Sequence, residues 1–358
     1  MAEHHVQRFS AIDGVTIAAA VDGDSDRAAI FAGKAGIPSI YRDIEQLAVA
    51  GAADAIAISS RDIWHAGSAI EALSRGLPVF CEKPMARRLE EARAMMQAAD
   101  ASGLPTMVNF SKRNGGLLSL ARDIIASGEI GRVESAEFFY LQDWLYSCRW
   151  GDWRTKPRWQ WRLDESQSSH GVLGDLGSHC VDAMLYLFDE ARPRACASRR
   201  FESSTSVAWR PKVGAEVAAS ALLDSPDCSE TLSVSFGARS SGDAFGFRIR
   251  GGLGDIVADT DQSRDKLTIL ADDGSTSRKA RPEEYPSTYE RFVQLALGGI
   301  DPLAEDRLDF GWGLDVVRII DSLAAIASSD VVGRAGGNVT ATADNPGSAD
   351  PNMPSRAP

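Results

Sequence analysis

The stretch Pro78-Val79-Phe80-Cys81-Glu82-Lys83-Pro84 is an apolar run of strand length that ends in two charges and a proline. Three further apolar runs of similar length lie between Gly14 and Phe110, with helix-like stretches between them. Strands are predicted at 15–21, 55–59, 78–83 and 106–110. Short apolar strands that alternate with helices are typical of a parallel sheet with crossover helices. Residues 1–113 are therefore predicted to form a Rossmann-like α/β domain.

The second half of the chain has a different pattern. After a predicted helix at 117–126 and a turn at 127–131, long strands joined by tight turns follow. These strands are predicted at 133–144, 216–223, 230–238, 245–250, 256–259 and 266–272, and helices at 175–188, 289–297 and 314–327. Residues 114–332 are thus predicted to form an α+β domain with a large, mainly antiparallel sheet. Residues 333–358 are small, polar and proline-rich, which predicts a disordered tail.

The composition excludes several classes of protein. A chain of 358 residues with 44% hydrophobic residues is long enough for two domains with separate cores. Its net charge of -12, with no basic stretch that stands out, argues against a nucleic-acid partner. The five cysteines are scattered and never form C-x-x-C, which favours a reducing compartment without structural zinc. With no apolar run of about 20 residues and no signal pattern, we expect a cytoplasmic protein without membrane contact.

Two short motifs bring together the residue types needed to remove a proton from an alcohol. Lys83 follows a strand at its carboxyl end, where open α/β folds bind ligands, and Pro84 fixes the direction of the exit. About ninety residues later, Asp175 and His179 are four apart on one predicted helix face, and Asp182 follows. The plain alternative is an aspartate that caps the helix, beside a buried histidine whose hydrogen bonds are satisfied within the core. A metal site is disfavoured because no further His or Cys cluster completes it.

These motifs, Glu82-Lys83-Pro84 and Gly174-Asp175-Leu176-Gly177-Ser178-His179, resemble signatures of the Gfo/Idh/MocA family of nicotinamide-dependent sugar and cyclitol oxidoreductases. The resemblance extends over residues 3 to 330 and assigns 114–332 to substrate binding and oligomerisation, in a homodimer or homotetramer. It implies that His179 takes the proton of a polyol hydroxyl, with Asp175 orienting the imidazole. It also implies that Lys83 contacts the nicotinamide ribose and the substrate, and that no metal is needed.

The resemblance also implies a set of cofactor-binding residues. Asp22 closes a strand where an acidic residue accepts hydrogen bonds from the adenosine ribose, and its charge repels a 2′-phosphate, which favours NAD over NADP. An aspartate before Gly23 also suits a simple turn. Ser59 and Ser60 end a strand that faces the dinucleotide, and Glu82 lies in the same cleft as Lys83. A lone histidine near the next helix start, His65, is interpreted as a packing or capping residue.

One expected part of a dinucleotide fold is missing. Residues 1–13 contain no glycine and look like the second half of the helix that normally follows a G-x-G-x-x-G turn. The absent first strand would be central in the sheet, so its loss exposes apolar neighbours. Gly251-Gly252-Leu253-Gly254 is no substitute, since it joins two predicted antiparallel strands. We expect either a start assigned too late or a truncated gene; the rival is a variant with altered cofactor binding.

Candidate substrate contacts come from three further places. Five of the eight tryptophans, at 144, 150, 153, 159 and 161, lie just before the catalytic helix, and Trp161 is a candidate for stacking on a sugar. The alternative is that they pack a long loop or a subunit contact. His170 lies where relatives carry glycine, and Arg113 follows the last predicted Rossmann strand. Substrate contacts are thus predicted for Lys83, Arg113, Trp161, His170, Asp175 and His179.

Three functions compete at this point. The first is an NAD(P)-dependent oxidoreductase that acts on a secondary alcohol of a sugar, inositol or related polyol. The second is a regulatory homologue that binds a dinucleotide or sugar without turnover, and the third is an inactive product of a truncated gene. Intact Lys83, Asp175 and His179 favour the enzyme, whereas the missing glycine-rich loop favours the other two.

Overall fold

The parallel strands predicted near the N-terminus are present, but they form two separate sheets. Strands β1 (Ala19–Val21) and β2 (Ser39–Tyr41) pair with each other, and β4 (Val79–Glu82) pairs with both β3 (Ile56–Ile58) and β5 (Thr106–Asn109). No strand of the described residues joins β1 to β3. In this computed structural model the described residues are 1–330 without 203–210, 212, 227, 239–240, 261–265, 272 and 281–284, so the predicted tail at 333–358 lies outside them.

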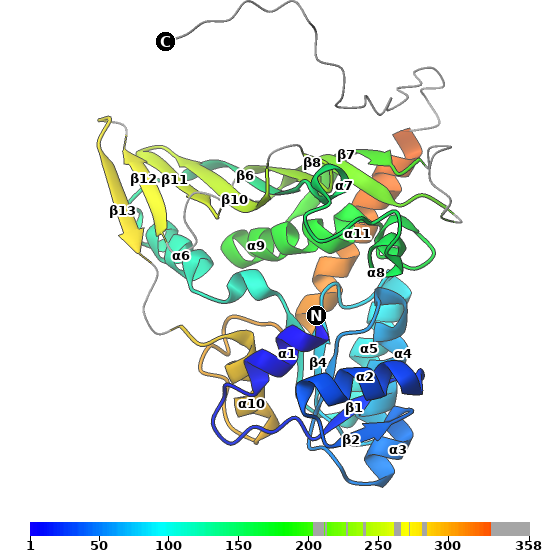
Figure 1. Ribbon diagram of the computed structural model, residues 1–358. Helices are drawn as coiled ribbons and strands as arrows, with labels where there is room; N and C mark the ends of the chain where they lie inside the picture. The colour runs from blue at the N-terminus through cyan, green and yellow to red at the C-terminus, as the bar shows by residue number, and fades with distance from the viewer. Residues whose placement is uncertain are drawn as a thin grey trace, which may run out of the picture.

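Helices connect these strands and begin and end for local reasons. They are α2 (Ser25–Ala35), α3 (Ile44–Val49), α4 (Asp62–Ser74) and α5 (Leu89–Ser102), which follow β1, β2, β3 and β4 (Figure 1). The Asp24 side chain caps α2 by accepting from the Arg27 amide, and Gly36 ends the helix in the left-handed conformation. Helix α1 (Ala2–Phe9) buries Phe9 against the Phe80 ring of β4. The helix predicted for the first residues is thus confirmed.

The second domain is built on one sheet of eight strands in the order β13-β12-β11-β10-β6-β9-β8-β7. Their bounds are β6 (Val133–Gln142), β7 (Arg192–Arg200), β8 (Glu216–Asp224), β9 (Ser229–Ser235), β10 (Asp243–Gly251), β11 (Gly254–Asp259), β12 (Lys266–Ala271) and β13 (Thr276–Ala280). All neighbours are antiparallel except β6 and β9, which confirms the mainly antiparallel prediction. Strands β7 and β13 were not predicted, because β7 alternates arginines with small residues and lacks an apolar run.

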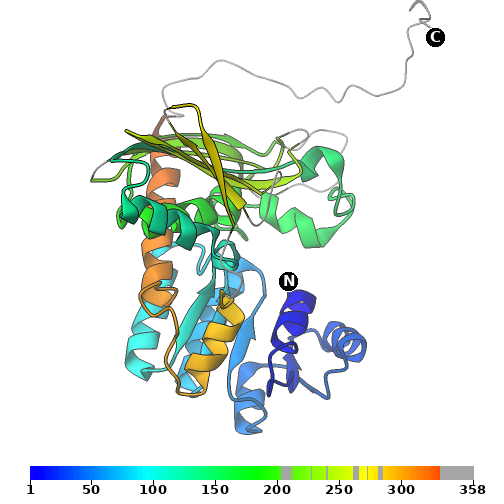
Figure 2. The same ribbon diagram turned by 90° about the vertical axis from the view of Figure 1, so that its left-hand side faces the viewer.

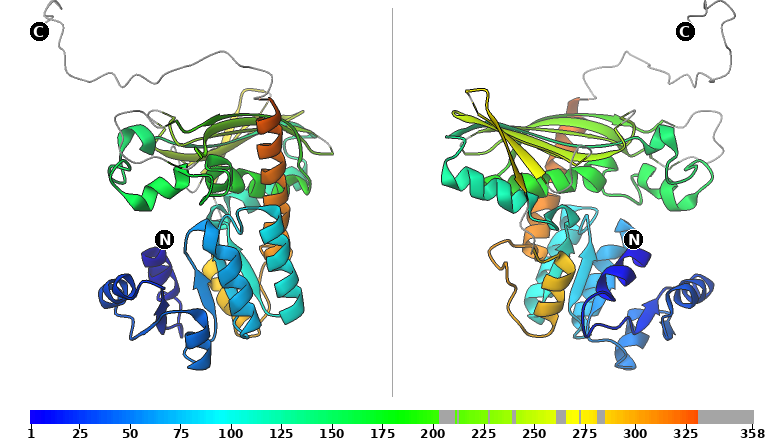
Figure 3. Two further views of the ribbon diagram at one scale, coloured as in Figure 1. Left: turned by 90° about the vertical axis from the view of Figure 1, so that its right-hand side faces the viewer. Right: turned by 60° about the vertical axis from the view of Figure 1, so that its left-hand side comes forward.

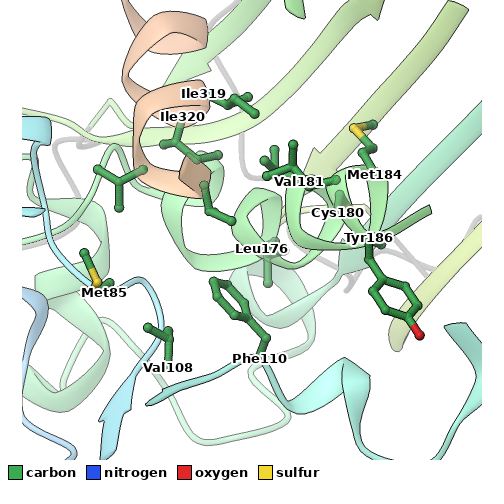
Figure 4. Packing of buried hydrophobic residues seen from close by; sticks show 14 of the residues in the cluster. Met85, Val108, Phe110, Leu176, Cys180, Val181, Met184, Tyr186, Ile319 and Ile320 are labelled. Atoms are coloured by element: carbon green, nitrogen blue, oxygen red, sulfur yellow. The ribbon is translucent and has the colours of Figure 1, made fainter. Parts of the chain in front are cut away.

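One face of the large sheet carries the helices that meet the N-terminal domain (Figure 2). They are α6 (Leu117–Ser127), α9 (Ser178–Phe188) and α11 (Phe310–Asp330), and α9 packs against β6, α6 and α11. Helix α9 is buried at ten of its positions, as expected for a helix between two layers. Met85, Val108 and Phe110 of the N-terminal domain lie below Leu176 and Ile320, so the apolar core is continuous across the two domains (Figure 4).

The chain returns to the N-terminal domain before its last helix. Helix α10 (Thr288–Ala296) begins with a capping box formed by Ser287 and Glu290 and lies beside the parallel strands (Figure 3). The Val108 amide of β5 donates to the Leu308 carbonyl at 2.8 Å. Residues near 288–308 therefore complete the domain whose other parts come from the first 113 residues. Among the described residues, no helix is long and apolar enough to cross a bilayer.

Candidate active site

The two motifs singled out in the sequence meet at the carboxyl end of β4. Lys83 directly follows this strand, and its Nζ donates to Asp175 Oδ1 at 2.5 Å and to the Asp175 carbonyl at 2.6 Å. The Lys83 and Asp175 side chains are 15% and 20% exposed, so the ion pair is largely shielded from water. A cation and a carboxylate 92 positions apart in the sequence are thus in direct contact.

Asp175 lies in a π-helical turn, Leu173–Gly177, that leads into α9. The turn packs so closely on the preceding loop that a Cβ on Gly174 would lie 1.9 Å from the Ser169 carbonyl oxygen, which explains the glycine. The second carboxylate oxygen of Asp175 accepts from Arg162 Nε at 3.1 Å. Although burial opposes the shift, the charges of Lys83 and Arg162 hold the pKa of the Asp175 carboxyl well below its usual range.

His179 occupies the first turn of α9, and its ring is only 3% exposed. Burial lowers the pKa of His179 well below its usual value, and the positive charges of Lys83 and Lys112 lower it further. The imidazole is therefore neutral at neutral pH and able to accept a proton. Its Nδ1 is buried without a hydrogen-bond partner among the described residues. The imidazole donates no hydrogen bond to Asp175, which was expected to orient it, because the Asp175 carboxylate accepts from Lys83 and Arg162 instead.

Arg162 is a site residue that the sequence reasoning missed. It belongs to a 3-10 turn, Trp161–Leu163, in the tryptophan-rich segment, and its guanidinium lies 4.4 Å from the centroid of the Trp161 ring. Trp161 is half-buried beneath this cation. No local motif marked Arg162, since only the fold brings the segment to Asp175, 13 positions away.

Arg113 is held in a buried ion pair, so its contacts give no support to the predicted contact with substrate. Its guanidinium is buried and donates to both carboxylate oxygens of Asp182, at 2.9 and 3.0 Å. Trp312 Nε1 donates to the same carboxylate at 2.8 Å. Asp182 therefore ties α9 to the 3-10 turn Ser111–Arg113 and to α11.

His170 is bonded to the last helix. Its Nε2 lies 2.7 Å from Asp321 Oδ1 of α11, and Asp321 Oδ2 accepts from the Leu89 amide at 2.7 Å. The residue has a φ of 51°, in the left-handed region where glycine is the easier choice. His170 therefore joins the loop before the catalytic turn to α11 and α5. Its contacts give no support to a role in substrate binding.

The predicted cofactor residues lie at the carboxyl ends of the parallel strands. Asp22 follows β1, and both of its carboxylate oxygens accept from Arg27, at 2.7 and 2.6 Å. The Arg27 hydrogen bonds outweigh burial and lower the pKa of Asp22. Ser59 is half-buried and Ser60 exposed, just beyond β3. Ser59 and Ser60 share the carboxyl edge of the β3-β4-β5 sheet with Lys83, whereas Asp22 follows a strand of the separate two-stranded sheet.

Glu82 points into the interior rather than toward this edge. The residue is 5% exposed, and its carboxylate accepts from Asn109 Nδ2 at 2.7 Å and lies 3.0 Å from His5 Nε2 of α1. Glu82 thus anchors β4 to α1 and β5, and direct contact with a dinucleotide has no support from its position.

His65 joins the ends of two strands. Its Nδ1 lies 2.9 Å from the Pro84 carbonyl oxygen and its Nε2 3.2 Å from the Ser60 carbonyl oxygen. Both neighbours are acceptors, so the ring satisfies both contacts only as the imidazolium. Burial opposes the charge, but the groups around it, including Cys81 and Asp62, raise the pKa of His65 to about 10. The interpretation of His65 as a packing residue is confirmed, and it fixes the turn that follows Lys83.

Two open hollows on the surface lie apart from the candidate catalytic residues. One of about 440 Å³ is lined by Asp24, Arg27 and other side chains of α1 and α2, and another of about 530 Å³ by residues near Ile17. Neither is lined by Lys83, Asp175 or His179. Among the described residues no group of three or more His, Cys, Asp or Glu side chains is arranged to hold a metal ion.

Comparisons with known proteins agree with this geometry. Residues 1–110 match the oxidoreductase family with an NAD-binding Rossmann fold, and residues 118–257 match the GFO/IDH/MocA C-terminal domain. The chain is 35% identical over 133 residues to levoglucosan dehydrogenase of Pseudarthrobacter phenanthrenivorans, covering 37% of this chain and 32% of that protein. It is 25% identical over 295 residues to scyllo-inositol 2-dehydrogenase (NADP(+)) of Bacillus subtilis, covering 79% and 81% of the two chains.

Solved structures share the fold. Levoglucosan dehydrogenase in complex with NADH and levoglucosan superposes with a TM-score of 0.75 at 22% identity, covering 92% of this chain and 93% of that one. In the alignments with the first three curated relatives, the chain spans between a third and about half of their length, 32%, 52% and 51%. The two family matches together extend over most of residues 1–257. The chain therefore belongs to the Gfo/Idh/MocA family of oxidoreductases, with an N-terminal NAD-binding Rossmann domain and the family's C-terminal domain.

Proposed function

We propose that this protein is an NAD-dependent dehydrogenase or reductase that transfers a hydride between the nicotinamide and a secondary alcohol of a sugar, inositol or related polyol. The observation that carries the proposal is the convergence of Lys83, Asp175 and His179 beyond the end of β4. Levoglucosan dehydrogenase and scyllo-inositol 2-dehydrogenase, to which the chain is similar, act on alcohols of this class by name.

The residues at the strand ends fit a nicotinamide dinucleotide. Asp22 is our candidate for the adenosine ribose, because the Arg27 side chain that bonds its carboxylate is 64% exposed and can move aside at little cost. Ser59 and Ser60 follow β3 and Lys83 follows β4, and we assign Lys83 to the nicotinamide ribose. When bound, the nicotinamide supplies the hydride acceptor.

The chain's own residues supply the acid–base chemistry. Neutral His179 accepts the hydroxyl proton at Nε2, since Nδ1 is buried in the core. Lys83 stabilises the negative charge that develops on the substrate oxygen, and in the opposite direction His179 returns the proton to a ketone. Asp175 holds the Lys83 ammonium in place and offers a carboxylate to a neighbouring hydroxyl. A buried, water-poor site strengthens each of these interactions.

Turnover on a panel of sugars and cyclitols, followed through NADH formation, tests this function. We expect reduction of NAD with at least one member of the panel, and loss of that reaction in Lys83→Met. Binding of NADH without turnover of any member would instead support the non-catalytic regulatory alternative. The predicted homodimer or homotetramer and the predicted cytoplasmic location stay predictions.

A further inference from the structure

The segment from Cys148 to Arg162 is positively charged, whereas the chain as a whole is negatively charged. It contains five cations, Arg149, Arg154, Lys156, Arg158 and Arg162, and one acid, Asp152, in a protein whose net charge is -12. No basic stretch stood out in the sequence because tryptophans separate the cations of this segment. Helix α8 (Pro157–Gln160) carries the end of this segment, between the large sheet and the N-terminal domain (Figures 1 and 2).

Two guanidiniums of this segment are held against one indole. Arg158 lies 5.4 Å and Arg162 5.0 Å from the centroid of the Trp159 ring, and Arg162 also donates to the Arg158 carbonyl at 3.3 Å. Trp159 is itself fixed, since it stacks on Trp150 at 5.5 Å and donates from Nε1 to the Trp150 carbonyl. Stacked guanidiniums lose less freedom when they bind an anion. The tryptophans thus form a rigid support for two cations.

The charges near Asp175 do not balance. Lys83 and Arg162 share the single carboxylate of Asp175. Within the part of the chain that the structure describes, Arg158 has no ion-pair partner, whereas Arg149 pairs with Asp143 and Arg154 with Asp152. An excess of positive charge therefore lies beside a largely shielded site. A bound anion would compensate this excess and give both guanidiniums the bidentate partner that they favour.

We propose that Arg158 and Arg162 form an anion-binding subsite beside Lys83 and Asp175, and that the substrate is a sugar or polyol carrying a carboxylate or a phosphate group. This inference rests on the proposed function for the reacting alcohol, whereas the excess positive charge at Arg158 and Arg162 does not depend on hydride transfer. The reacting hydroxyl lies at Lys83 and His179, and the anionic group lies toward α8. The two arginines thus determine specificity, and they leave the proton and hydride transfers to the other residues.

Binding measurements on matched ligands test the subsite. The probes are hexoses and inositols, each compared with its uronate where one exists and with its monophosphate, by calorimetry on the full chain with and without NADH. We expect an anionic member to bind at least about tenfold more tightly than its neutral partner, and added salt to reduce the difference. Whether uronates or phosphates show the effect identifies the anion.

Two variants separate a specific subsite from general surface charge. Arg158→Gln is expected to reduce the anionic-to-neutral affinity ratio about tenfold. Arg154→Gln is the matched control, because Arg154 stacks on Trp153 in the same segment but is paired with Asp152, and it is expected to keep the ratio. Equal binding of neutral and anionic members, or an equal effect of both variants, would overturn the inference. Charge-selective binding without hydride transfer would refute the proposed function and leave the subsite standing.

Discussion

Replacing Arg113 by methionine tests whether this residue is structural. Arg113 is 3% exposed, and the Asp182 carboxylate that it neutralises is fully buried. Two hydrogen bonds of 2.9 and 3.0 Å join them, and in the variant Asp182 would keep only the bond from Trp312. Leaving a buried charge without its partner costs about 3–5 kcal/mol. This is a large share of the roughly 5–15 kcal/mol that stabilises a typical domain.

Urea unfolding, followed by tryptophan fluorescence, measures this cost. We expect the midpoint to fall in Arg113→Met, and to recover in the double variant Arg113→Met/Asp182→Leu, which removes both charges. Because burial raises the pKa of Asp182, the loss in the single variant should be smaller at acidic pH, where the carboxyl is neutral. The KM of the folded variant for its alcohol substrate should be unchanged. A raised KM with normal stability would refute the structural role and restore Arg113 to the substrate site.

Three further predictions concern other parts of the molecule. Burial raises the pKa of Glu230 in β9 from 4.5 to about 8. The protonated carboxyl is compatible with burial, so its full contribution to stability is present below pH 4.5 and is lost as the carboxyl ionises. Stability should fall as pH rises from 4.5 through about 8, by at most about 5 kcal/mol, and Glu230→Gln should remove that loss in urea titrations across this range. His65→Phe removes the contacts to the Ser60 and Pro84 carbonyl oxygens and should lower kcat about tenfold or more by releasing the turn after Lys83, with partial recovery in His65→Gln. Asp22→Ser should shift the kcat/KM preference toward NADP about tenfold, because it removes the repulsion of a 2′-phosphate.

Each of these has a contrary result. Parallel pH profiles of stability in wild type and Glu230→Gln would show that the carboxyl is already ionised when folded. Normal kcat in His65→Phe would show that the turn after Lys83 holds without the imidazole. An unchanged coenzyme preference in Asp22→Ser would mean that the adenosine ribose binds away from β1.

The sequence predicted those parts of the site that depend on the regular geometry of the fold. Lys83, which follows β4, was predicted because the carboxyl ends of parallel strands share one edge, and His179 was predicted from its spacing of four from Asp175, which lies in the π-helical turn before α9. These rules require no knowledge of the tertiary partners. The same reasoning predicted the parallel strands and the mainly antiparallel sheet.

Pairings between distant charges could not be predicted in this way. Arg113 looked like a ligand-binding residue because its partner, Asp182, is 69 positions away, and Arg162 was overlooked because only the folded loop brings it to Asp175. Strand β7 was missed for a related reason. Four of its nine residues are arginines and the others are small, so no apolar run indicates a strand. The strand forms by pairing with β8.

The most direct test of the account is the effect of His179→Asn on the chemical step. Single-turnover measurements with an active alcohol should show NADH formation slowed by about 10²–10⁴-fold, because the proton acceptor is lost. Dissociation constants for NADH, measured in parallel, should change by less than about twofold, since the proposed partner of the His179 imidazole is the substrate hydroxyl and not the dinucleotide. Hydride transfer at the wild-type rate would contradict the assignment of His179 as the base, and loss of NADH binding would contradict the placement of the site.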